Sequence, residues 1–206
     1  MAVKTRGRRP SGERLAERIV DTAIHMAEEV GWNNLRLRLI AERLGISLSE
    51  LSVHFRDLDA VADAWFRRAR SAMLAPAEEG FAELPARERL HRIMMRWFDA
   101  LAGHRRVTAE MLATKLYPSH PHHWVPLIFN LSRTIQWVRD AAGLDAGGGR
   151  RQVEEVGLTL LFLATLAVWV RDDTPDQERT RRFLDQGLAA ADRGMVGLYG
   201  PGRGPG

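Results

Sequence analysis

Apolar residues recur at helical spacing along nearly the whole chain, and no run shows the alternation of a β-strand. In the first such segment, Leu15, Ile19 and Ala23 are each four residues apart, with charged residues between them. This spacing brings them to one face of a helix. We therefore predict an all-α fold of about nine helices. The expected helices span residues 13–30, 37–44, 47–55, 57–75, 86–102, 106–116, 123–142, 152–170 and 176–193.

A sharp turn is predicted in the stretch IAERLGISLSELSVHF, residues 40–55, where two short helical segments are separated by three residues. Gly45 can adopt the left-handed conformation that such a turn requires. Ser47 and Glu50 have the spacing of a capping box, so a new helix is expected to begin there.

The face that this second short helix presents follows from its register. We expect Leu48, Leu51 and Phe55 to lie near one face and to be buried. The outward face then carries small polar side chains, which are Ser49, Ser52 and His54. A capped short helix after a glycine turn is typical of a helix-turn-helix, whose second helix enters the major groove of double-stranded DNA.

A cluster of positive charge precedes this motif. The segment MAVKTRGRRP contains Lys4, Arg6, Arg8 and Arg9 and no acidic residue, while the whole chain has a net charge of +4. We expect a flexible basic arm suited to phosphate backbones. A tail that only improves solubility is the alternative.

The segment RIVDTAIHMAEEVGWNNLRLRLIAERLGISLSELSVHF, followed by RDLDAVADAWF, resembles the DNA-binding domain of the TetR family of bacterial repressors. The resemblance covers residues 13 to about 66 and implies a helical ligand-binding and dimerisation domain after it. With the arm, it implies DNA contacts by Arg6, Arg8, Arg9, Arg36, Arg38, Ser47, Ser49, Ser52, His54 and Arg56. The chain departs from the family pattern at Arg36, Ser52 and Leu58, where the family usually has Ser or Thr, an aromatic residue and Lys.

These expectations divide the chain into four parts. They are the arm at 1–12, the helix-turn-helix domain at 13–70, the ligand-binding and dimerisation domain at 71–195, and a disordered Gly/Pro-rich tail at 196–206.

A second resemblance concerns the C-terminal half. The segments RTIQWVRDAAGLD and FLATLAVWVRDDTPDQERTRRFLDQGLAAA resemble lipid-binding accessory proteins of ubiquinone biosynthesis, which have a TetR-like fold without DNA binding. Two functions are therefore open. One is a homodimeric transcriptional regulator, a repressor that a small hydrophobic ligand releases from a pseudo-palindromic operator. The alternative is a lipid- or isoprenoid-binding accessory protein.

Both functions predict an apolar cavity in the second domain, lined by methionine and aromatic side chains. The alternative is that the same residues only fill the core. The candidate lining residues are Met94, Trp97, Phe98, Leu101, Met111, Phe129, Trp137 and Trp169.

Two C-terminal helices are predicted to pair with those of a second copy in a four-helix bundle. The candidate interface residues are Leu160, Ala164, Ala167, Phe183, Leu184, Gly187 and Leu188. The apolar run at 156–170 is shorter than the roughly 20 residues of a membrane span, so we expect a helix that is buried either in the core or in a subunit interface.

The segment DDTPDQ predicts a helix start, with Thr174 at the cap and Gln177 in a capping box. Asp172 and Asp173 are expected to be solvated there, or paired with Arg171.

Several chemistries are not expected. The loop histidines at 120–123 lack metal-binding spacing, and no G-x-S-x-G motif or phosphate loop is present, so we expect neither metal, cofactor nor enzymatic activity. The absence of cysteine and of a secretory signal favours a cytoplasmic location.

Overall fold

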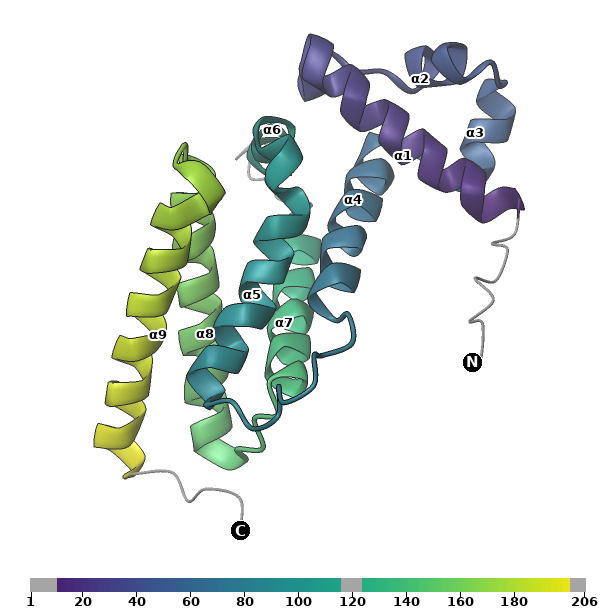
Figure 1. The fold of residues 1–206 in the computed structure, drawn as a ribbon. Helices are drawn as coiled ribbons and strands as arrows, with labels where there is room; N and C mark the ends of the chain where they lie inside the picture. The colour runs from purple at the N-terminus through teal and green to yellow at the C-terminus, as the bar shows by residue number, and fades with distance from the viewer. Residues whose placement is uncertain (1–10, 116–123, 201–206) are drawn as a thin grey trace, which may run out of the picture. The chain divides into compact units, whose positions relative to one another are not determined.

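The structure, a computed structural model, describes residues 11–115 and 124–200; side-chain surroundings are not described for Ser11 and residues 124–132. The described ranges are helical with no strand, so the all-α prediction is confirmed (Figure 1). The α-helices are α1 (Ser11–Val30), α2 (Leu37–Leu44), α3 (Leu48–His54), α4 (Leu58–Met73), α5 (Ala86–Leu101), α6 (Arg105–Lys115), α7 (Trp124–Ala141), α8 (Gly148–Trp169) and α9 (Glu178–Tyr199).

Two of these helices are longer than the sequence pattern predicts. α8 begins at Gly148 and not at 152, and α9 continues to Tyr199, so residues 196–199 of the expected tail are helical. The other helices begin and end within a few residues of the predicted positions.

The chain forms two compact units. Unit 1 consists of residues 1–67 and 106–114, and unit 2 consists of residues 68–105 and 115–206. α4 therefore contributes residues to both units, and most of α6 belongs to unit 1.

Unit 1 has a core built on α1. Its apolar stripe is buried, with Ile19 and Ala23 fully inaccessible to solvent, and α2 and α3 contribute Ile40 and Leu51 to the same unit. Each fully buried isoleucine or leucine stabilises the fold by about 1.5–3 kcal/mol relative to an exposed side chain. This core fixes the orientation of α3.

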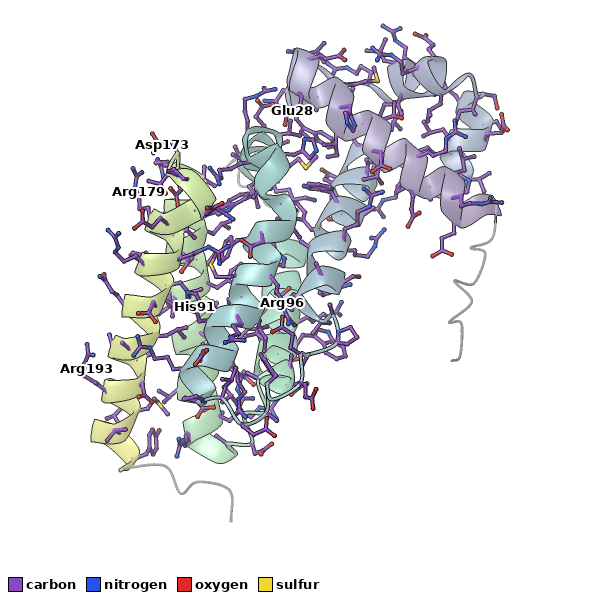
Figure 2. The ribbon with its side chains drawn as sticks, in the orientation of Figure 1. Glu28, His91, Arg96, Asp173, Arg179 and Arg193 are labelled. Carbon is purple, nitrogen blue, oxygen red and sulfur yellow. The ribbon has the colours of Figure 1, made fainter. Side chains whose placement is uncertain are left out.

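Hydrogen bonds attach α6 to the rest of unit 1. The Trp65 indole Nε1 donates to Thr108 Oγ1 at 3.0 Å, and the Trp32 backbone N–H donates to Glu110 Oε2 at 2.6 Å. Arg106 forms a 2.9 Å ion pair with Glu28, which is labelled in Figure 2. The distant segment at 106–114 is thus part of the unit that carries α3.

Unit 2 is a helical bundle of α5, α7, α8 and α9, in which α8 and α9 lie side by side (Figure 1). Its centre is aromatic: Phe98 stacks on Phe162 with ring centroids 5.4 Å apart, and Trp97 meets Phe162 edge-on at 5.1 Å. Such pairs add about 0.5–1.5 kcal/mol each beyond the area they bury.

Two predictions for the turn between α8 and α9 are wrong. Asp172 is buried rather than solvated, and its carboxylate accepts hydrogen bonds from both Thr174 and Thr180. Gln177 is not in a capping box. It lies in the left-handed region at φ 59°, where its Oε1 accepts from Trp169 Nε1 at 2.6 Å and its Nε2 donates to Asp99 at 2.7 Å.

Asp173, by contrast, is exposed and pairs with Arg179 at 3.0 Å, not with Arg171; both partners are labelled in Figure 2. The two adjacent aspartates therefore have different roles. One holds the buried turn, and the other makes a surface ion pair.

Candidate functional site

The turn before α3 has the predicted geometry. Gly45 is left-handed at φ 65° and ψ 33°, and its N–H donates to the carbonyl oxygens of Ala41 and Glu42. This closes the end of α2 and leaves Ser47 in an extended conformation at the start of α3.

The capping box is also confirmed. The Glu50 N–H donates to Ser47 Oγ at 3.1 Å, and Glu50 Oε2 accepts from the Ser47 N–H at 3.0 Å. Hydrogen bonds from the Ser47 backbone and hydroxyl lower the pKa of the exposed Glu50 carboxyl, although burial acts weakly in the opposite direction. The bonds hold Glu50 at the helix start as a carboxylate, so its negative charge stays with the cap.

The buried side of α3 differs from the prediction in one residue. Leu51 and Phe55 are buried, as expected. Leu48 is 53% exposed, so it lies on the outer face and not beside them. His54 is only partly exposed, and its ring lies near Gly12 of α1, so it does not point freely outward.

The exposed side of α3 contains Ser49 and Ser52, as predicted, and also Val53, which is 80% exposed. Neither Leu48 nor Val53 was among the predicted surface residues. Counting about 100° per residue places Val53 with the two serines, but it places Leu48 between Ser52 and the buried Phe55, so the count alone does not decide the exposure of Leu48.

Three arginines surround this motif, and each makes local contacts. Arg36 donates to the carbonyl oxygens of Asn33 and Leu35 at 2.9 and 2.7 Å, next to the start of α2. Arg38 pairs with Glu42 at 3.5 Å, and Arg56 pairs with Asp57 at 2.9 Å.

Because the pairs of Arg38 and Arg56 are solvent-exposed, each is worth no more than about 1 kcal/mol and exchanges readily for a phosphate. Arg6, Arg8 and Arg9 lie outside the described residues.

No protein-family model and no curated protein matches the chain. Among solved structures, the TetR transcriptional regulator from Nitrosomonas europaea ATCC 19718 shares 42% sequence identity with it at a TM-score of 0.78. The match covers 86% of this chain and 98% of that one. The chain belongs to the TetR family of transcriptional regulators.

Two more distant structures agree in fold. A TetR regulator from Rhodococcus sp. RHA1 has 17% identity and a TM-score of 0.63, covering 86% of this chain and 96% of its own. The multidrug binding protein EbrR, complexed with imidazole, has 22% identity and a TM-score of 0.56, covering 90% and 97%. At these identities only the fold is shared. A TetR-family chain with an intact helix-turn-helix is a DNA-binding transcriptional regulator.

The predicted ligand-binding residues of this TetR regulator fall into three groups. Met94, Trp97, Phe98, Leu101 and Trp169 are all buried in unit 2, where Phe162, which the sequence analysis did not select, joins the aromatic cluster. Met111 is buried but belongs to unit 1, and Trp137 is 49% exposed. The side chain of Phe129 lies outside the described residues.

The predicted dimer-interface residues differ in exposure between α8 and α9. On α8, Leu160 is 62% exposed, and Ala164 and Ala167 are exposed beside it. On α9, however, Leu184 and Leu188 are buried within unit 2 itself, and Phe183 is partly exposed.

Gly187 faces Leu161 of the same chain, whose Cδ1 lies 2.3 Å from the position a Cβ would take. This glycine and the two buried leucines therefore pack α9 against its own protomer. Among the predicted interface residues, the exposed apolar ones are on one face of α8.

That face is wider than predicted. Val153, Val156 and Leu163 are exposed large apolar residues at three- to four-residue spacing with Leu160, and Gly157 leaves open space between them. A shallow hollow lined by Gln152, Val153, Val156 and Gly157 continues the face toward the start of α8.

α8 is, within the described part of the chain, the one helix whose length and composition would allow it to cross a membrane. The whole helix has 22 residues and is longer than its apolar run at 156–170, so length alone does not exclude a span. Its first turns nevertheless carry ion pairs, Arg150 with Glu154 at 3.2 Å and Arg151 with Glu155 at 2.8 Å. Charged pairs of this kind favour a helix of a folded domain.

Proposed function

We propose that this TetR-family regulator is a homodimeric repressor that binds a pseudo-palindromic operator and is released by a small hydrophobic ligand. It would act in the cytoplasm, on the chromosome of the cell that makes it. The observation that carries the proposal is the capped α3, whose outer face exposes Leu48, Ser49, Ser52 and Val53.

The DNA contacts would come from one side of unit 1. α3 would enter the major groove, while Arg36, Arg38 and Arg56 around it would bind phosphates. The basic arm with Arg6, Arg8 and Arg9 would reach further along the backbone. These contacts supply affinity and register, and the α3 face supplies sequence preference.

A homodimer is supported by the exposed face of α8. An apolar stripe over four turns, with a glycine and two alanines along it, suits close packing against a second copy. Burying such a face offsets the unfavourable exposure of Val156, Leu160 and Leu163. A homodimer would bind two half-sites about 34–36 Å apart, or a little more.

Ligand control is supported by the composition of the unit 2 core. Met94, Trp97 and Trp169 give it adaptable and aromatic side chains, and α4 contributes residues to both units. A hydrophobic ligand that prefers another position of α4 would lower operator affinity by its differential affinity for the two states. This coupling is commonly about 1–3 kcal/mol.

The test is fluorescence anisotropy of the purified protein on pooled genomic DNA fragments across a salt series, with enriched fragments sequenced. Removing residues 1–12, or making Arg56→Ala, should weaken binding and lower the salt slope by about 0.9 for each lost phosphate contact. Arg182→Ala is the matched control, because Arg182 is an exposed arginine of α9 in unit 2 with a Glu178 partner. It should leave the slope unchanged.

Enriched fragments with an inverted repeat would support the proposal. If no fragment binds at low salt, the DNA-binding role fails, and the lipid-binding alternative should then be examined by mass spectrometry of co-purified lipid. Light scattering of the same sample measures the oligomeric state, and a stable monomer would contradict the dimer.

A further inference from the structure

The polar side chains of α3 are largely used within the helix. Ser47 and Glu50 bind each other in the capping box, with the Ser47 hydroxyl also donating to Glu50 at 3.1 Å. The Ser52 hydroxyl donates to the Ser49 carbonyl oxygen at 2.7 Å. No long hydrogen-bonding side chain such as Arg, Lys, Asn or Gln is present between residues 48 and 54. The usual bidentate contacts to guanine and adenine are therefore missing from this helix.

The outer face of α3 presents apolar side chains instead. Leu48 and Val53 are the two most exposed large hydrophobic residues of the motif, at 53% and 80%. At about 100° per residue, the order around the helix is Leu48, Ser52, Ser49 and Val53, over an arc of roughly 140°. Two small serines in the centre allow the helix to approach base edges closely, and the two apolar side chains flank them.

The major groove contains one apolar group on the edges of unmodified base pairs, the C5-methyl of thymine. We propose that Leu48 and Val53 determine operator specificity by packing against thymine methyl groups on either side of α3. The inference rests on the proposed function and adds to it the chemistry of base reading. It predicts that each half-site contains thymines at the steps that flank the helix.

The test uses the operator fragment selected above, synthesised with deoxyuridine in place of thymine, which removes only the methyl group. A buried methyl is worth about fourfold in affinity, so each contacted thymine should weaken wild-type binding by about that factor. The variants Leu48→Ala and Val53→Ala should weaken binding to the thymine operator. Each should also lose the thymine preference at its own step, because the methyl then has no partner.

Arg56→Ala is the matched control, since a lost phosphate contact should weaken binding to thymine and deoxyuridine operators equally. If deoxyuridine has no effect on the wild type, the inference is overturned while DNA binding stands. If both alanine variants keep the wild-type thymine preference, the weaker binding to deoxyuridine operators comes from DNA shape, and the inference is again overturned. Failure of every fragment to bind would instead refute the proposed function.

Discussion

Asp172→Asn should destabilise the protein measurably, because both oxygens of this buried carboxylate are used. Oδ2 accepts from the Thr180 N–H at 2.8 Å and its hydroxyl at 2.6 Å, while Oδ1 accepts from the Thr174 N–H at 3.0 Å. An asparagine amide has one oxygen, so its NH₂ group must face one of the two backbone N–H groups. The threonine hydroxyls can rotate to accept, but a backbone N–H cannot.

One buried, unpaired N–H costs about 1–3 kcal/mol. For a chain of this size each kcal/mol lowers Tm by about 2–4 °C, so the expected decrease is about 2–12 °C. The assay is thermal and urea unfolding followed by circular dichroism at one protein concentration, because the proposed dimerisation would make Tm concentration-dependent. Asp173→Asn is the matched control, since Asp173 is 86% exposed and its surface ion pair contributes about 1 kcal/mol or less.

The pH dependence gives a second check on the same residue. Burial raises the pKa of Asp172, but the hydrogen bonds from Thr174 and Thr180 outweigh it, and the pKa lies well below its usual value. Since the pKa in the unfolded chain is about 3.9, the stabilisation is fully present above that pH and decreases as pH falls through the lower folded value. The difference in the free energy of unfolding between wild type and Asp172→Asn should therefore become smaller below about pH 4. Equal stability of the two asparagine variants at pH 7 would refute this reasoning.

Three further substitutions test other parts of the molecule. Gly45→Ala places a Cβ on a left-handed residue and should reduce stability by about 1–2 kcal/mol in urea unfolding, whereas Gly103→Ala, with open space and no positive φ, should be neutral or stabilising. Leu160→Glu should convert the proposed dimer to a monomer, as measured by light scattering, and should abolish operator binding. A mutant that stays dimeric would show that the α8 face is not the dimer interface. Arg139→Met should lower the free energy of unfolding in urea by about 3–5 kcal/mol, because it removes the buried ion-pair partner of Glu154 at 3.0 Å. A decrease below about 1 kcal/mol would show that Arg150 alone satisfies the Glu154 carboxylate.

Local signals in the sequence were sufficient where one residue type determines the geometry. Gly45 and the Ser47–Glu50 capping box are as predicted, and Asp57 caps α4 in the same local way, with its Oδ1 accepting from the Ala60 N–H at 2.7 Å. Each depends on contacts within four residues. Helix boundaries and turns that arise in this way can be read from the chain itself.

Local spacing gives the wrong prediction where a contact with a residue distant in sequence determines the conformation. Gln177 has the right spacing for a capping box, yet Trp169 and Asp99 capture both ends of its amide and hold its backbone at a positive φ. A buried indole N–H needs an acceptor, and this need outweighs the local preference. Spacing within the turn contains no information about the position of Trp169.

Apolar periodicity has a related limit, because it identifies a face but not its partner. Leu184 and Leu188 of α9 and Leu160 of α8 carry the same signal, yet the two α9 leucines are buried in the protomer and Leu160 is exposed. The small residues show the same ambiguity: Gly187 accommodates Leu161 of its own chain, whereas Gly157 has open space. Only the packed structure separates an internal contact from a surface available to a second copy.

Leu48 illustrates how this limit bears on DNA recognition. A seven-residue helix has two turns, too few for periodicity to fix its buried face, so a leucine near Leu51 and Phe55 was assigned to the core. In the structure Leu51 and Phe55 are buried, whereas Leu48 is 53% exposed. A thymine methyl is the one apolar partner that the major groove offers to the exposed part of this side chain. The misassigned residue is therefore the one that most directly connects the register of α3 to operator choice.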